Sequence, residues 1–502
     1  MSYTQTTNGA TALKSTGSNI VDYFMMFSRN LDKNSNYEYL EKCWTDNPKK
    51  TVAIIFNGRD RVNGKKEKKI ANEAMLWLRK NKFSTYCDNI QNYIDKYGCW
   101  KDLLFISYYL TNNYNNKNYE VNIFASKLLN DKNKLENKEN VSLCAKWAPS
   151  ENDRNDKRKQ IAKRVANEIY GSRDEKNMEK YRKEIIVPLR NKINIVESQM
   201  CSDKWCEIKY EYVPGVASKR LLKAFMKHDE ERYKQYLFDV RNGKKKIKVT
   251  GILPHELTKY YIETRHFDDY KANETIELQW RTILDNVKKS GNFDNSLAII
   301  DLSGSMFCAS NGSIPAQVAV SLGILTSQCC NGLFKNKFIT FSEEPELITL
   351  EYKEPTLFES LNSMMAASYG FSTDFVKCCE AIISYGIKNN IQDSEMPKKL
   401  FVFTDMQFNN AQCGDTIETI YQNIVEKYKI SGYTVPKFIF WNLNSDNKNT
   451  FPVNSDTEGT SIVSGFSEQL LKIFMNYDEF KPEFIVDEIL NPYLDNIIIS
   501  DD

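Results

Sequence analysis

The 502-residue chain predicts a multi-domain protein with an all-helical N-terminal part and a C-terminal α/β domain. Three observations support this prediction. Apolar residues recur at three- and four-residue spacings through the first half of the chain. Short β-branched and aromatic runs alternate with helical patterns in the second half. The charge balance changes sign near residue 293, which marks a boundary between the two parts.

The first half is interpreted as helices that pair in antiparallel fashion, as in an α-solenoid. Its helical patterns cover residues 70–78, 86–97, 100–110, 161–170 and 217–237. Residues 1–30 are rich in Ser, Thr, Asn and Gly and predict a disordered arm. We therefore expect a helical domain over residues 31–290, an α/β domain over 293–480, and an acidic tail over 481–502 that packs back on the helices.

Four apolar runs in the second half predict the strands of one sheet, at residues 296–300, 337–342, 399–405 and 436–442. Helical patterns at residues 315–329, 374–386 and 416–430 separate them. Strands that alternate with helices favour a parallel sheet covered on both faces. Since ligands of such sheets bind at the carboxyl ends of the strands, polar residues there are candidates for function.

Oxygen-bearing side chains gather at two of these strand ends. Asp301, Ser303 and Ser305 follow the first strand at alternate positions of one tight loop, and Asp405 ends the third strand. Thr373 opens a helix and offers a further hydroxyl. Hard cations such as Mg²⁺ bind oxygen ligands of this kind and keep several waters of their own. The pattern predicts a divalent-cation site, and the alternative is a metal-free fold whose serines cap a helix.

These five residues match, in order, the metal-ion-dependent adhesion site of von Willebrand factor A domains, and the chain from residue 293 onward resembles that family. The resemblance implies a doubly wound, Rossmann-like fold. It also implies direct metal contact from Ser303, Ser305 and Thr373, with Asp301 and Asp405 acting mainly through metal-bound water. One coordination position would stay open for a carboxylate from a protein partner.

Other patterns resemble TROVE-type proteins, in which a ring of helical repeats precedes a von Willebrand A domain. They are the runs FNGRDRVNGKKE at residues 56–67, YGCWKDLL at 97–104 and AKWAP at 145–149. The runs WCEIKYEYVP at 205–214 and FVFTDMQF at 401–408 are similar to a family of uncharacterised TROVE-like proteins in giant viruses, plants and fungi, a domain of unknown function. One departure is that no arginine follows Glu67 in the first run.

The charge distribution favours a nucleic-acid partner for the first half. From Phe293 onward the chain has 13 lysines, no arginine and 28 acidic residues, a balance of −15. The preceding part has 55 basic and 38 acidic residues, a balance of +17. A basic excess supplies the sequence-independent attraction that nucleic acids need, and the TROVE resemblance implies binding of non-coding RNA. The candidate phosphate contacts are Arg59, Arg61, Lys65, Lys66, Lys146 and Lys219, with Trp147 or Tyr212 as base-stacking side chains.

Lysine clusters lie at residues 65–69, 154–164 and 244–248, and the alternative for each is a solvated helix face or loop. We interpret the chain as a non-enzymatic binding protein that holds RNA or a ribonucleoprotein and uses Mg²⁺ to bind a protein carboxylate. Two alternatives stay open. One is a protein–protein scaffold in which the basic part docks on the acidic part. The other is a metal-dependent hydrolase in which Asp301 and Asp405 activate a bound water.

Motifs of the common enzyme classes are missing from the sequence. It contains no Walker loop, G-x-S-x-G or G-x-G-x-x-G run, and its three histidines stand outside metal-ligand spacing. No apolar run is long enough to span a membrane, and the N-terminus lacks a secretory pattern. The cysteine pairs at 329–330 and 378–379 lie on apolar helical patterns, which favours reduced thiols. We therefore expect an intracellular, cytoplasmic protein, or a virion component if the chain is viral.

Overall fold

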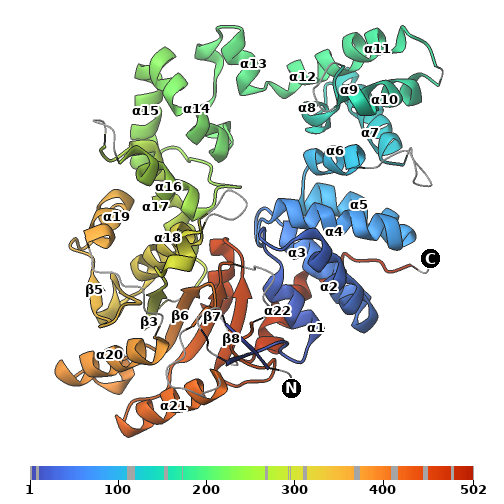
Figure 1. The fold of residues 1–502 in the computed structure, drawn as a ribbon. Coiled ribbons are helices and arrows are strands. Elements are labelled where there is room, and N and C mark those ends of the chain that lie inside the picture. The colour runs from blue at the N-terminus through green and yellow to red at the C-terminus, as the bar shows by residue number, and fades with distance from the viewer. Residues whose placement is uncertain are drawn as a thin grey trace. The chain divides into compact units, whose positions relative to one another are not determined.

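The computed structural model describes residues 3–6, 9, 11–109, 119–151, 156–171, 173–265, 270–291, 293, 295–308, 314–366, 374–408, 417–444, 450–475 and 480–500. The chain, drawn in Figure 1, divides into two compact units. Unit 1 comprises Met1–Ile70, Pro214–Leu222 and Lys234–Ile497, and unit 2 comprises Ala71–Val213, Lys223–Tyr233 and Ile498–Asp502. Each unit combines segments from both ends of the chain, so the compact units do not follow the predicted boundaries after residues 30, 290 and 480.

Unit 1 is built on a six-stranded sheet with the strand order β5-β4-β3-β6-β7-β8. Five of these strands are parallel, whereas β5, at one edge, runs antiparallel to β4. The strands are β3 (Ser296–Ile300), β4 (Lys337–Thr340), β5 (Leu347–Thr349), β6 (Lys399–Thr404), β7 (Lys437–Asn442) and β8 (Thr460–Ser464). The four predicted strands are confirmed, and β5 and β8 were not predicted.

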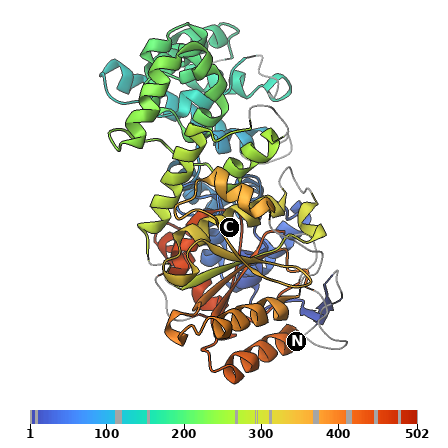
Figure 2. The ribbon, with the colours of Figure 1, turned by 90° about the vertical axis from the view of Figure 1, so that its left-hand side faces the viewer.

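Helices cover both faces of this sheet, as predicted. Helix α18 lies on one face and α20 and α21 lie on the other (Figures 1 and 2). The crossovers from β3 to β4 and from β6 to β7 leave the centre of the sheet in opposite directions, and right-handed crossovers then place their helices on opposite faces. The helices that follow β3 in the chain are α18 (Pro315–Cys329), α19 (Leu357–Ala366), α20 (Phe375–Lys388), α21 (Ile417–Ile430) and α22 (Pro482–Leu494).

Close packing of α18 on β3 fixes the strand end that carries Asp301. Thirteen of the 15 residues of α18 are buried, because its side chains are small or apolar on every face. A Cβ atom at Gly323 would lie 2.2 Å from Cδ1 of Ile300, the residue just before Asp301. Only glycine lets the helix approach the strand this closely.

The first 30 residues were expected to form a disordered arm, and this prediction is wrong for most of the segment. Strands β1 (Tyr3–Gln5) and β2 (Thr11–Leu13) pair in antiparallel fashion. Helix α1 (Asn19–Met26) buries seven of its eight residues. The apolar run from Ile20 to Phe27 outweighs the polar residues that precede it, because its burial in unit 1 offsets the entropy of ordering the segment.

Helix α22 packs on α3 (Pro48–Arg59) within unit 1, so the acidic C-terminal segment does return to the N-terminal helices. Lys50 and Asp487 form an ion pair at 2.6 Å, and the Tyr493 hydroxyl donates to Asp60 Oδ2 at 2.9 Å. The other helices of unit 1 are α2 (Lys33–Asp46), α16 (Pro254–Thr264) and α17 (Glu274–Lys288). No helix in the described part of the chain is long and apolar enough to cross a membrane.

Unit 2 is helical, and its core contains a buried ion pair. Arg79 Nε lies 2.7 Å from Glu120 Oε1, with side chains 4% and 1% exposed, and the Tyr86 hydroxyl donates to the same oxygen at 3.0 Å. The pair joins α4 to α7. The helices that lie wholly or mostly in this unit are α4 (Lys68–Asn81), α5 (Phe83–Asn92), α6 (Trp100–Tyr109), α7 (Tyr119–Glu136), α8 (Cys144–Trp147), α9 (Asp156–Lys159), α10 (Ile161–Tyr170), α11 (Asn177–Lys180), α12 (Val187–Ile193) and α13 (Val196–Cys201).

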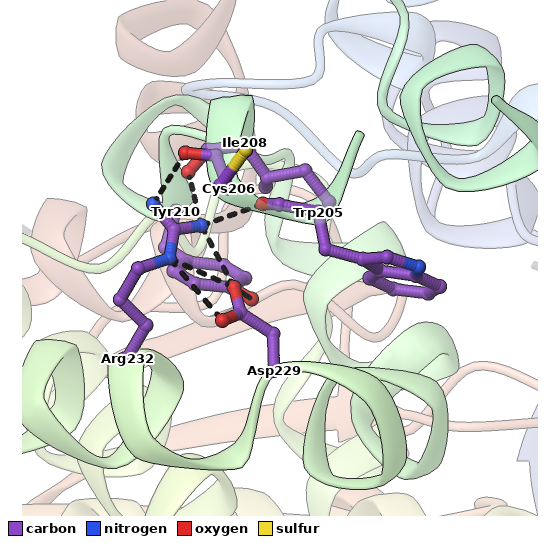
Figure 3. A network of polar contacts seen from close by, with 6 residues as sticks. All are labelled: Trp205, Cys206, Ile208, Tyr210, Asp229 and Arg232. Atoms are coloured by element: carbon purple, nitrogen blue, oxygen red, sulfur yellow. Dashed lines mark hydrogen bonds and ion pairs between the residues drawn. The ribbon is translucent and has the colours of Figure 1, made fainter. Parts of the chain in front are cut away.

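The helix predicted over residues 217–237 is two helices, α14 (Gly215–His228) and α15 (Glu230–Arg241), which are divided at Asp229. The Asp229 carboxylate accepts hydrogen bonds from Arg232 at 2.7 Å and from the Tyr210 hydroxyl at 2.6 Å (Figure 3). The Arg232 guanidinium also donates to three main-chain carbonyls, those of Trp205, Cys206 and Ile208. These bonds hold the break between the helices against the irregular segment that precedes α14.

Candidate functional site

The candidate metal loop begins at Asp301, at the carboxyl end of β3. The Asp301 N–H donates to the Phe403 carbonyl at 2.9 Å, so the loop leaves the sheet directly beside β6. The Asp301 carboxylate is fully buried: Oδ1 accepts the Ser303 N–H at 2.9 Å and Oδ2 accepts the Thr404 hydroxyl at 2.6 Å. Burial raises the pKa of this carboxyl, and the hydrogen bonds from Thr404 and Ser303 lower it.

Two hydroxyl groups of the same loop lie side by side. Ser303 Oγ and Ser305 Oγ are 3.2 Å apart. Neighbouring ligands of an octahedral Mg²⁺ ion, at 2.0–2.1 Å from the metal, lie about 2.9 Å from each other. The two hydroxyls therefore fit adjacent positions around such an ion with little movement, and both are hard oxygen donors.

Asp405 reaches the same rim of the sheet from the end of β6. Its Oδ1 atom accepts the Gln407 N–H at 3.1 Å, and only 2% of the residue is exposed. Met406, which follows it, adopts φ 65°, a left-handed conformation that is strained for a non-glycine residue. The Thr404 hydroxyl accepts the Met406 N–H at 3.1 Å and donates to Asp301, so one hydroxyl joins both loops.

The rim lies at the switch point of the sheet. The chain runs from β3 to one side and from β6 to the other, and ligands of open α/β sheets bind in the crevice outside such a pair of strands. Asp301, Ser303, Ser305 and Asp405 are therefore brought to one edge, as predicted. Thr373, the fifth predicted ligand, lies outside the described residues. Across the described ranges, no three His, Cys, Asp or Glu side chains form a group that could hold a metal ion, so any site here depends on hydroxyl ligands.

Thr404 was not among the predicted site residues. It is the last residue of β6 and is fully buried. A threonine inside an apolar strand is usual, because β-branched side chains favour strands. The position of Thr404 next to Asp405, where the strand meets the loop, could have indicated a role in the site.

Two of the predicted phosphate contacts are not on the surface, which corrects their assignment. Lys65 is 0% exposed, and its Nζ donates to the carbonyls of Phe24 and Phe27 and to the Ser464 hydroxyl. Burial lowers the pKa of Lys65 well below its usual range. Lys66 Nζ lies 2.7 Å from Glu468 Oε1, with side chains 8% and 4% exposed. Both ammonium groups have partners inside unit 1, so neither is placed to meet a phosphate.

The other four predicted contacts are partly or wholly withdrawn from solvent. Arg59 is 4% exposed, and Arg61 is half-buried. Lys219 Nζ donates to the Glu256 carbonyl at 3.0 Å. Lys146, in unit 2, is half-buried with its Nζ 5.5 Å from the centre of the Trp147 ring. Of the two proposed stacking residues, Trp147 is half-buried, whereas Tyr212 is 64% exposed.

A helical region together with a mixed, mainly parallel α/β domain defines this chain as a multi-domain protein, and comparisons with known proteins place it in a family. The model of a domain of unknown function, DUF2828, matches residues 6–122 and 118–293, and that of a second, DUF7788, matches residues 295–490. The chain belongs to the DUF2828 family. The two matches meet between residues 293 and 295, where the charge balance changes sign.

A protein from a giant virus is similar to this chain over nearly its whole length. The chain is 33% identical to "Uncharacterized protein L728" of Acanthamoeba polyphaga mimivirus over 98% of this chain and 88% of the relative. Among solved structures, the crystal structure of the Deinococcus radiodurans RO (RSR) protein aligns with a TM-score of 0.37 and 12% identity, covering 95% of this chain and 94% of that one. A score this low does not by itself show a common fold.

Proposed function

We propose that residues 293–480 form a von Willebrand A-like domain that binds Mg²⁺ through Asp301, Ser303, Ser305, Thr373 and Asp405. The observation that carries the proposal is the pair of serine hydroxyls 3.2 Å apart beside a buried carboxylate at the switch point of the sheet. The oxygen-only donor set fits a hard cation. A cation beside Asp301 also favours the ionised carboxylate, which burial alone disfavours.

The role proposed for this site is binding of a partner, with no turnover. A bound Mg²⁺ would supply one open coordination position to an acidic side chain of another protein. Ser303 and Ser305 hold the ion, Asp301 orients the loop through the Ser303 N–H, and Thr404 fixes the Asp301 carboxylate.

The metal-dependent role is tested by capture of the native partner from cell extract on immobilised full-length protein, in Mg²⁺ and in a chelator. We expect capture in Mg²⁺ alone, and its loss in Ser305→Ala, which is half-exposed and leaves the Asp301 bonds in place. Capture that is equal in Mg²⁺ and chelator would contradict the adhesion role. Phosphoester turnover that disappears in Ser305→Ala would favour the hydrolase alternative.

We also propose that the TROVE-like helical part binds RNA. The basic excess of +17 before residue 293 supports this, but the contacts need to be reassigned. The lysine loop after α15 is the better surface, since Lys244, Lys245, Lys246 and Lys248 are all exposed. The loop is held in place because the Tyr236 hydroxyl donates to the Lys246 carbonyl at 3.1 Å.

A further inference from the structure

A cavity of about 320 Å³ lies within unit 1, apart from the candidate metal loop. Its walls come from four separate segments of the chain. Arg29 follows α1, Lys219 lies on α14, and His255 and Lys259 lie on α16. Gln317, in the first turn of α18, completes the wall. The volume is at the lower end of the range for small-molecule sites.

Three cations line the wall of this cavity, and one of them, Arg29, is paired with the buried Glu67, with Arg29 Nε 3.2 Å from Glu67 Oε2. The wall also carries the two carboxylates of Glu256 and Glu263. These carboxylates are loosely engaged: Lys219–Glu256 and Lys259–Glu263 are each 3.5 Å apart, and the second pair is 41% and 63% exposed. An exposed ion pair such as Lys259–Glu263 contributes little and leaves Lys259 able to rearrange, whereas Lys219 Nζ also donates to the Glu256 carbonyl at 3.0 Å.

The N-terminus of α16 adds to the positive potential. Helix α16 has 11 residues, and its N-cap residue, Leu253, makes no side-chain capping bond. His255 and Glu256, in the first turn, line the cavity, so the positive end of the helix dipole lies at its wall.

His255 brings a buried polar atom to this wall. The residue is 5% exposed, and its Nδ1 atom has no hydrogen-bond partner among the described residues. Burial, together with the charges of Arg29, Lys219 and Lys259, holds the pKa of its imidazole well below the usual range. Buried polar atoms are normally paired, and an unpaired one calls for an explanation such as an absent ligand. An oxyanion in the cavity would accept hydrogen bonds from the cations and give the imidazole an acceptor.

We propose that this cavity binds a phosphate group, through Arg29, Lys219, Lys259 and the imidazole of His255. A phosphate carries close to two negative charges near neutral pH and three strong acceptor oxygens, so it matches several donors arriving from different segments. The phosphate could be free or the terminal group of a nucleotide strand. The inference does not depend on the proposed metal site or on the reassigned lysine loop.

Histidine NMR tests the proposal directly, because the chain has only three histidines, His228, His255 and His266. Full-length protein carrying ¹⁵N-labelled histidine is titrated with inorganic phosphate at constant ionic strength, and His255→Gln assigns the signal. We expect a saturable shift of the His255 resonances while those of His228, an exposed ring stacked on Trp205, stay in place. Chloride at the same ionic strength should give no saturable shift.

Removing one cation should weaken phosphate binding while the protein stays folded. Lys259 is partly exposed, so Lys259→Gln should raise the Kd for phosphate roughly tenfold, as expected for loss of one charge-assisted hydrogen bond. The matched control is Lys388→Gln, at an exposed position on α20, which should leave the Kd unchanged.

Two further ligands distinguish the source of the phosphate. A 5′-phosphorylated oligonucleotide that shifts His255 more tightly than inorganic phosphate identifies a strand end, and an equal or weaker response identifies the free ion. The same oligonucleotide without its phosphate should not shift His255. No saturable shift with any phosphate, or the same Kd in wild type and Lys259→Gln, would overturn the proposal.

Discussion

The Thr404 hydroxyl donates to Asp301 Oδ2 at 2.6 Å and thereby joins the ends of β6 and β3, the two central strands of the sheet. Both residues are fully buried. Through this bond Thr404 holds the Asp301 carboxylate in the orientation in which Oδ1 accepts the Ser303 N–H. The geometry of the candidate metal loop therefore depends on a side chain that is not itself one of the predicted ligands.

Replacing Thr404 by valine should destabilise the protein and weaken the metal site together. The change leaves Asp301 Oδ2 buried without its donor, which costs about 1–3 kcal/mol of unfolding free energy. Loss of a residue that orients a metal ligand typically lowers metal affinity by about 10- to 100-fold. Denaturant unfolding and Mg²⁺ titration measure the two effects. Thr349→Val, at an exposed position of the edge strand β5, is the control and should change neither quantity.

The buried Lys65 should give the protein a pH-dependent stability in the alkaline range. Its pKa in the folded state is well below the usual 10.5, so between the folded value and 10.5 the unfolded chain binds more protons than the folded chain. The unfolding free energy of the wild type should therefore rise with pH across that window, by up to about 1.4 kcal/mol per pH unit. The stability gained in this window is lost again as the pH falls to the folded pKa.

Lys65→Met should remove this slope and also lower stability at all pH values, because the Ser464 hydroxyl and two main-chain carbonyls lose their donor. Urea unfolding from neutral pH to above 10.5 provides the comparison. Lys388→Met, at an exposed position, is the control and should keep the wild-type slope. A parallel slope in Lys65→Met and wild type would show that Lys65 is not the group responsible.

In unit 2, Arg79→Met should be strongly destabilising. It leaves the Glu120 carboxylate, 1% exposed, buried with the Tyr86 hydroxyl and without the guanidinium that lies 2.7 Å from Oε1. Breaking a buried pair in this way costs about 3–5 kcal/mol. The contrasting change is Lys183→Met in the pair with Glu179, where both side chains are 62% exposed, and thermal unfolding should barely shift. Equal effects from the two variants would contradict the role of burial.

RNA binding should depend on the lysine loop after α15 and on salt. Reversal of charge at Lys244 and Lys246 should weaken binding to all RNA sequences alike. The logarithm of the association constant falls linearly with the logarithm of the salt concentration. The charge reversal should make this slope shallower by about 0.7 for each phosphate of a single strand that the loop no longer neutralises. Filter binding across a salt series measures both. Lys388→Glu is the control for a general change in charge. If the wild type retains no RNA even at low salt, the scaffold alternative gains support.

The sequence predicted the sheet and its functional rim because both depend on local patterns. Apolar runs flanked by helical patterns identified β3, β4, β6 and β7, and the polar residue after each run indicated the carboxyl end of the strand. Strand β8 escaped prediction because its five residues, TSIVS, are mostly polar although all are buried. It pairs with β7 and packs against α1 and α22, and no local pattern reveals this packing.

The same limit explains the two lysines of the predicted RNA surface. A lysine in a charged loop is normally solvated, and nothing near Lys65 in sequence indicates its partners. They are the carbonyls of Phe24 and Phe27, about 40 positions earlier, and the hydroxyl of Ser464, 399 positions later. Gly465 lies beside the lysine stem, because a Cβ atom built on it would lie 3.5 Å from Lys65 Cβ, and its φ of 109° is a conformation that other residues rarely adopt. This arrangement exists only once the N-terminal helices have packed on β8.

The central claim is that the loop after β3 binds a divalent cation, and calorimetric titration of Mg²⁺ into the metal-free full-length protein tests it most directly. We predict a saturable isotherm with one ion bound per chain, and a loss of affinity of at least about tenfold in Ser305→Ala. Ser290→Ala, at the end of α17, should bind as the wild type does. The absence of a saturable isotherm in the wild type, or the same affinity in Ser305→Ala, would contradict the account.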